Sequence, residues 1–148
     1  MANKLWEKDF EVNKGIGGFT VGRDREMDLY LAKYDVLGSM AHITMLESIG
    51  LLTKDELEKL LAELRKIYTV CEEGKFVIEP DVEDVHSQVE LMLTRALGDT
   101  GKKIHSGRSR NDQVLVDLKL FTRHEIRDIA DHVKILFDEL IQKSNQYK

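Results

Sequence analysis

The stretch that decides the fold runs from residue 111 to residue 148 and reads NDQVLVDLKLFTRHEIRDIADHVKILFDELIQKSNQYK. It contains neither glycine nor proline, and a seam of mostly apolar side chains recurs at steps of three and four residues. The seam consists of Leu115, Leu118, Thr122, Ile126, Ile129, Val133, Leu136 and Leu140. This spacing predicts one helix of about 57 Å. Because so long a helix needs partners, we expect either an oligomeric bundle or a chain cut inside a larger domain.

The composition of the 148 residues agrees with an all-α protein. The chain is 42% hydrophobic with a net charge of −5, and Pro80 is its only proline. The single cysteine, Cys71, leaves no intrachain disulfide framework and favours a reducing, cytoplasmic setting. Neither a membrane span nor a secretory leader is evident, and the acidic balance disfavours nucleic-acid binding.

Three shorter helices are expected before the long one. The first covers residues 24–50 and the third covers residues 81–97, capped by Asp81 and closed by Gly98. The apolar face of the first consists of Met27, Tyr30, Leu31, Tyr34, Leu37, Ala41 and Met45. The second predicted helix lies between the first and the third. Thr53 and Glu56 form a capping box at its start, and it ends before Gly74. The short connection at residues 50–53 predicts that the first two helices are antiparallel.

His86 lies inside the apolar stripe of the third predicted helix. A buried imidazole needs a hydrogen-bonding partner, so the simplest interpretation is that His86 is a core residue whose ring is hydrogen-bonded within the protein. His42 is likewise expected in the core or at its boundary.

The segment from residue 101 to residue 113 inverts the charge balance, with a net charge of +3 in an acidic chain. Within a predicted polar loop at residues 99–110, Arg108 and Arg110 offer planar forks for carboxylates or phosphates. Ser109 and Asn111 add polar groups near the predicted start of the long helix, whose free N–H groups favour an anion. The residues therefore suggest a site for a compact anion, although a solvated basic loop explains them too. No nucleotide-binding glycine pattern, metal-ligand cluster or nucleophile–base pair is evident.

At residues 105–113 the sequence HSGRSRNDQ resembles the signature of argininosuccinate lyases. EDVH at residues 83–86, followed by Glu90, resembles a second segment of that family. DVLGS at residues 35–39 and GLLT at residues 50–53 also resemble its amino-terminal part, in the expected order. The resemblance covers nearly the whole chain but only the first part of the family's longer polypeptide.

The resemblance implies β-elimination of argininosuccinate to arginine and fumarate in arginine biosynthesis, with no metal or organic cofactor. It implies that substrate is bound by Arg108, Ser109, Arg110 and Asn111. Asp84 and His86 would lie at the rim of the pocket, and Gln113 would support the loop. No catalytic acid or base is expected before Lys148, because the family's THxQ and GSSxMPxK motifs do not occur here. This chain alone is therefore expected to be inactive.

The resemblance also implies a domain division and an oligomer. Residues 1–110 would form a helical domain that carries the substrate-binding loop, and residues 111–148 the first helix of a truncated central bundle. The family is a homotetramer, so association through the long helix is expected.

The amino-terminal arm departs from the family, since the common LWGGRF is replaced by LWEKDF at residues 5–10. Two alternatives remain open. One is another fumarate-releasing lyase of the fumarase/aspartase superfamily, and the other is a non-catalytic module that resembles the lens crystallins.

Overall fold

The computed structural model describes residues 15, 19 and 21–147, and every regular element in that part of the chain is helical. The elements are α2 (Asp24–Met27), the 3₁₀ turn η1 (Asp28–Tyr30), α3 (Ala32–Ser48), α4 (Lys54–Glu72), α5 (Val85–Leu97), α6 (Asp99–Lys102), the 3₁₀ turn η2 (Lys103–His105) and α7 (Arg110–Gln146). The all-α prediction is confirmed. The expectations for the arm at residues 5–10 concern residues outside the described part.

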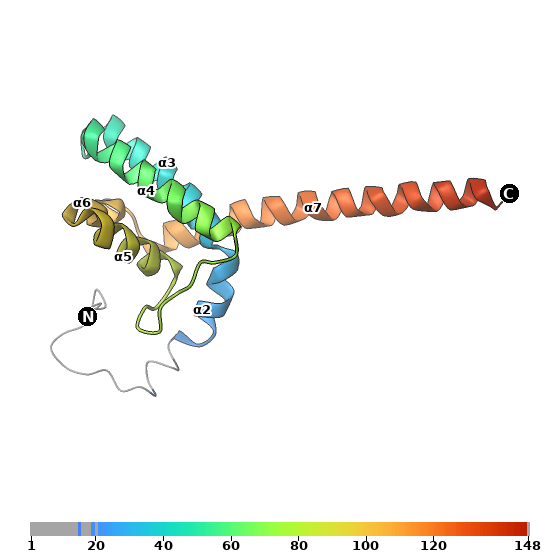
Figure 1. Cartoon of the computed structure of the whole chain (residues 1–148), viewed down its shortest axis with the longest axis horizontal. Helices are drawn as coiled ribbons and strands as arrows, with labels where there is room; N and C mark the ends of the chain where they lie inside the picture. Colours follow the sequence, from blue (N-terminus) through green and yellow to red (C-terminus); the bar gives the residue numbers. More distant parts are fainter. Residues whose placement is uncertain (1–14, 16–18, 20, 148) are drawn as a thin grey trace.

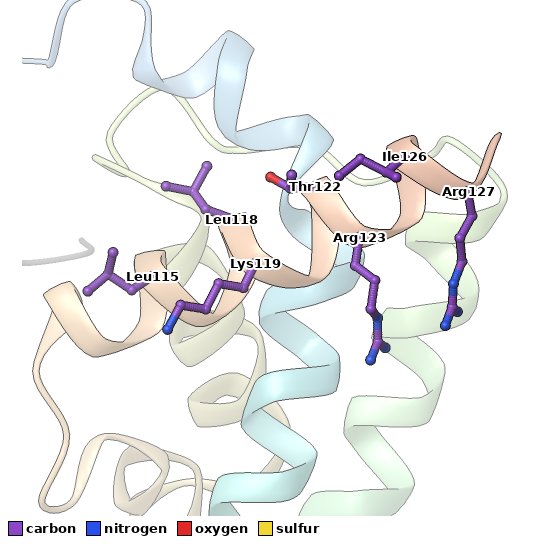
Figure 2. A pocket seen from close by; sticks show the side chains of 7 residues that line it. All are labelled: Leu115, Leu118, Lys119, Thr122, Arg123, Ile126 and Arg127. Atoms are coloured by element: carbon purple, nitrogen blue, oxygen red, sulfur yellow. The ribbon is translucent and has the colours of Figure 1, made fainter. Parts of the chain in front are cut away.

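Helices α3 and α4 lie side by side, and α7 crosses the end of this pair before extending away from the other helices (Figure 1). The core between α3, α4 and α5 is aliphatic, and its fully buried side chains include Val36, Ile43, Leu46, Leu60, Leu64, Val85, Val89 and Leu93. No helix in the described ranges has an apolar stretch long enough to cross a membrane.

The prediction for residues 24–50 was wrong in two respects. The helix is interrupted by η1, so its regular part begins only at Ala32. In addition, most of the predicted apolar face is exposed, including Tyr30, Leu37 and Met45, whereas Val36 and Ile43 are buried. Because α3 carries apolar residues around its whole circumference, their spacing could not identify the packed face.

Helix α4 begins as predicted. The Thr53 hydroxyl accepts the Glu56 N–H at 3.2 Å, and the Glu56 carboxylate accepts the Thr53 N–H at 2.9 Å. Lys103 of η2 also donates to Glu56 at 2.5 Å, which lowers the pKa of that carboxyl to about 2. The capping box therefore starts the helix and also ties η2 to it.

Helix α5 begins at Val85, not at residue 81 as predicted. Asp84 is its N-cap, with extended backbone and a side chain that accepts the Ser87 N–H at 2.8 Å. The end at Gly98 is confirmed, and this glycine has a φ of +62°. The predicted loop after it instead contains the short helical turns α6 and η2, because Gly101 packs directly against the backbone of α5.

Helix α7 begins at Arg110, with Ser109 as N-cap, and continues for 37 residues. Only Gln113 and Asp117 are buried among its residues, and both lie near its start. The predicted seam beyond them is exposed, with Ile126, Val133 and Leu136 each about 60% accessible.

Candidate functional site

The predicted anion-binding residues meet where the loop at residues 106–109 joins α7, facing the start of α5 and the middle of α3. Arg110 attaches the start of α7 to α5. Its guanidinium donates to the Asp84 carboxylate and, through Nη2, to the Ser87 hydroxyl at 2.8 Å. Arg110 and Asp84, which are 26 residues apart in sequence, are therefore paired at the site.

Arg108 lies against α3 on the other side of the loop. Its Nη1 donates to the Ser39 hydroxyl at 3.0 Å, and the guanidinium is partly buried. Burial lowers the pKa of Arg108, although the nearby carboxylates of Asp35 and Asp117 favour its charged form. Gly38 of α3 lies beside this guanidinium, since a Cβ there would be 3.4 Å from Nη2.

His86 lies in the first turn of α5 and is buried against two other helices. Its Nδ1 is 2.8 Å from Asp35 Oδ1 in α3 and 3.8 Å from Asp117 Oδ2 in α7. A carboxylate can only accept, so Nδ1 carries the proton. Gln113 Nε2 donates to the same Asp35 oxygen at 3.4 Å. His86 is therefore a hydrogen-bonded buried residue, as its position in the apolar stripe suggested.

Opposing effects act on the pKa of His86. Burial lowers the pKa, but the hydrogen bond and negative charge of Asp35 raise it, with further contributions from Asp84 and Asp117. The net effect is a pKa above the ordinary value of 6.5, so the cationic form is favoured.

Asp117 is completely buried, and neither of its side-chain oxygens has a hydrogen-bond partner. Burial, reinforced by the negative charge of Asp35, raises its pKa to about 7, while His86 and Arg108 act in the opposite direction. A proton on this carboxyl reduces the cost of burying two acidic groups together.

Asp35, His86 and Asp117 each place a possible ligand atom within 4.8 Å of the others. Such donors can hold a metal ion in principle. Here, however, Asp35 already binds the His86 ring, and Arg108 adds a second positive charge to the cluster. We therefore describe it as a buried network in which the acidic groups already have cationic partners within the protein.

Ser109, Asn111 and Asp112 are exposed at the start of α7. The Ser109 hydroxyl accepts the Asn111 N–H at 3.2 Å, and the Asp112 carboxylate accepts the Ser109 N–H at 3.0 Å. Two N–H groups that an anion could have used are thus occupied by the helix's own capping box. Contacts to a ligand would come mainly from side chains.

Several residues of the site were not selected from sequence. Asp35, Ser39 and Asp117 complete the network, and Ser87 completes the Arg110 contact. His42 is half-buried and lies 2.9 Å from the Ser106 carbonyl oxygen, so its ring holds the loop against α3. A usable signal existed only for Asp35 and Ser39, which lie in the DVLGS segment at residues 35–39.

A protein-family model described as Lyase matches residues 15–148. The chain belongs to this lyase family. It is 76% identical over its whole length to argininosuccinate lyase of Bacteroides thetaiotaomicron, and 44% identical to argininosuccinate lyase of Thermotoga neapolitana. It covers 33% and 38% of those proteins, respectively. Argininosuccinate lyase of Methylococcus capsulatus is 43% identical over 93% of this chain, which covers 30% of that relative.

The chain thus spans about a third of the length of these lyases. The matched family region includes all the site residues described above. The resemblance found in the signature at residues 105–113 therefore extends through the packed helices and α7.

Proposed function

We propose that this chain is the amino-terminal portion of an argininosuccinate lyase and provides part of its substrate-binding site. The observation that carries this proposal is the arrangement of Arg108 and Arg110 on either side of the buried His86 cluster. One arginine is fixed to α3 and the other to α5. Two guanidinium groups held in place near each other in sequence suit a substrate with more than one carboxylate.

The proposed reaction releases fumarate from argininosuccinate, leaving arginine. Removal of a proton beside a succinate carboxylate creates an intermediate with additional negative charge on that group. Fixed cationic and N–H donors stabilise such charge when they are held in place before the reaction. Arg108, Arg110 and Asn111 are the donors we assign to the substrate, with Ser109 as a further hydroxyl contact.

Asp84 and Gln113 have supporting roles in this proposal, and we place His86 at the rim of the substrate pocket. Asp84 limits the freedom of Arg110, and Gln113 contacts the carboxylate that binds His86. Arg110 uses two N–H groups on Asp84 and Ser87. A guanidinium has five, and the Glu83 carboxylate lies 3.8 Å from Nη1, so we assign the N–H groups not bonded to Asp84 and Ser87 to a ligand.

We assign the catalytic acid and base to parts of the enzyme other than these 148 residues. We also propose the division into a helical domain at residues 1–110 and the first bundle helix at residues 111–148. The exposed α7 seam supports a homo-oligomer formed through this helix, in a cytoplasmic enzyme.

The decisive experiment replaces the matching third of the Bacteroides thetaiotaomicron enzyme with residues 1–148 of this chain. The chimera is assayed for fumarate release from argininosuccinate by ultraviolet absorbance. We expect activity from the chimera and none from the 148-residue chain alone. An inactive but folded chimera, or activity of the isolated chain, would contradict the proposed division of labour.

Arg110→Ala tests the site within the active chimera. We expect a loss of about 10²-fold or more in kcat/KM, since a fixed donor to developing charge is removed. Arg65→Ala is the matched control, because Arg65 is exposed on α4, away from the site. Equal activities of the two variants would remove Arg110 from the proposed binding site.

A further inference from the structure

The buried network beneath the two arginines contains a residue to which neither the lyase signature nor the proposed substrate contacts assign a role. Asp35 lies in the first turn of α3, is fully buried, and accepts from both His86 and Gln113. We propose that Asp35 is a positioning residue, which holds the His86 ring through Nδ1 and so reserves Nε2 for an anionic ligand. This inference rests on the proposed function, because the anionic ligand that we assign to His86 is the carboxylate-bearing substrate of that function.

The first step of the argument is the geometry of the ring. An imidazole has two nitrogens, and the partner of one determines what the other can do. With Nδ1 held at 2.8 Å by Asp35, the ring can rotate only by breaking a buried hydrogen bond. Nε2 is therefore fixed in direction, as substrate positioning requires.

The second step is the protonation state. When His86 is cationic, Nε2–H donates and can bind a carboxylate. When the ring is neutral, its single proton remains on Nδ1, which donates it to the hydrogen bond with Asp35. Nε2 is then a hydrogen-bond acceptor and repels a carboxylate. Asp35 thus determines whether His86 acts as an anion-binding donor.

The third step concerns the other charges around the ring. Asp28, Asp84 and Asp117 face it from η1, the start of α5 and α7, and Arg108 lies near Asp35 and Asp117. Of these acids, Asp117 carries no hydrogen bond and Asp84 is occupied by Arg110. Asp35 is the only carboxylate within hydrogen-bonding distance of His86 in the described structure.

The first test is the tautomer of neutral His86, measured on the unsubstituted 148-residue chain by ¹⁵N NMR of its imidazole nitrogens. We expect the proton on Nδ1 at high pH, whereas a ring without a carboxylate partner has no such constraint. A neutral ring protonated on Nε2 would overturn the proposal. This measurement needs no variant and so does not depend on how substitutions affect folding.

The second test compares the His86 titration in Asp35→Asn and Asp55→Asn. Asparagine keeps the shape of Asp35 but removes the charge that raises the His86 pKa, so we expect the His86 pKa to fall in this variant. Asp55 is exposed on α4 and forms an ion pair with Lys59, so its replacement should leave His86 unchanged. An unchanged His86 pKa in folded Asp35→Asn would refute the positioning role.

The third test uses the active chimera and its pH profile. Asp35→Asn is expected to lower kcat/KM and to shift its decline with rising pH to a lower pH, as the titration of His86 requires. A uniform loss of activity at every pH would indicate a structural role only and would contradict the proposal. If the unsubstituted chimera is inactive, the proposed function fails, while the two NMR measurements still decide whether Asp35 positions His86.

Discussion

Leu64 and Leu136 are the same residue type in two long helices, yet their surroundings are opposite. Leu64 in α4 is fully buried between α3 and α5, whereas Leu136 in α7 is 59% exposed. The difference extends to whole regions, because every residue from 129 to 147 is exposed while α3, α4 and α5 share one aliphatic core. The packed region (α3, α4 and α5) and the outer half of α7 (residues 129–146) are therefore both helical, and they differ mainly in how many of their apolar side chains are buried.

The comparison shows where the site obtains its rigidity. Arg108, His86 and Asp117 are held by α3, α5 and the inner end of α7, where these helices contact one another. Most helical stability in proteins comes from packing rather than from propensity. The side chains of the outer half of α7 are all exposed among the described residues. We therefore expect that substitutions which disturb the binding residues differ from those which disturb the exposed seam.

The largest expected effect comes from Leu64→Ala in the packed region. Removing this fully buried side chain leaves a cavity, and we expect the free energy of unfolding to fall by about 2–5 kcal/mol. The measurement is urea denaturation at low protein concentration. A loss below about 1 kcal/mol would show that the core between α3 and α4 is looser than its burial indicates.

Gly101→Ala is expected to rank next, at about 2–3 kcal/mol. A Cβ at Gly101 would lie 2.5 Å from the Thr94 nitrogen and overlap the backbone of Leu93, so α6 would have to move off α5. Gly74→Ala is the control, since Gly74 has a φ of +66° but open space around it. That strain alone costs about 1 kcal/mol, so equal losses would contradict the close packing of α6.

The same contrast explains what could be predicted from sequence. Local signals were sufficient for the capping box at Thr53, the end of α5 at Gly98 and a continuous helix predicted from residue 111, one residue after its observed start, because each depends on neighbouring residues. The predicted face of α3 was wrong because that helix is apolar on all sides and only its partners decide which side is buried.

The candidate site divides in the same way. The signature residues Arg108 and Arg110 could be selected because they lie two residues apart in a segment that is unusually basic for this chain. Their partners could not, since Asp35 is 51 residues from His86 and 78 residues from Gln113. The burial of Asp117 could not be predicted either, because an aspartate in an amphipathic helix ordinarily faces solvent.

An intermediate effect is expected from pH, through the buried acid Asp117. Its folded pKa of about 7 exceeds the ordinary 3.8, so the folded state holds a proton that the unfolded state releases. Stability is therefore present below pH 3.8 and declines as pH rises towards 7, by about 2 kcal/mol between about pH 5.5 and 7. The raised pKa of His86 acts in the same direction above pH 6.5.

Asp117→Asn removes this titration while keeping the shape of the side chain. We expect a flatter profile of unfolding free energy between pH 5.5 and 7, with the part due to His86 retained. Asp55→Asn, on the exposed face of α4, should follow the unsubstituted chain. Parallel profiles for all three proteins would mean that Asp117 is ionised throughout this range.

The smallest effect is expected from Leu136→Ala at low protein concentration. Since the Leu136 side chain is 59% exposed, the free energy of unfolding should change by less than about 0.5 kcal/mol. At higher concentration, association along the seam would bury this side chain and make stability depend on concentration. Sedimentation velocity should then show oligomers of the unsubstituted chain and a weaker tendency to associate for Leu136→Ala. A monomer at every concentration would contradict association through α7. A different result would contradict the contrast between the packed helices and the outer half of α7. That result is a fall of more than about 1 kcal/mol in the free energy of unfolding of Leu136→Ala in a monomeric sample. Such a fall would require Leu136 to be packed within one chain, whereas its side chain is exposed.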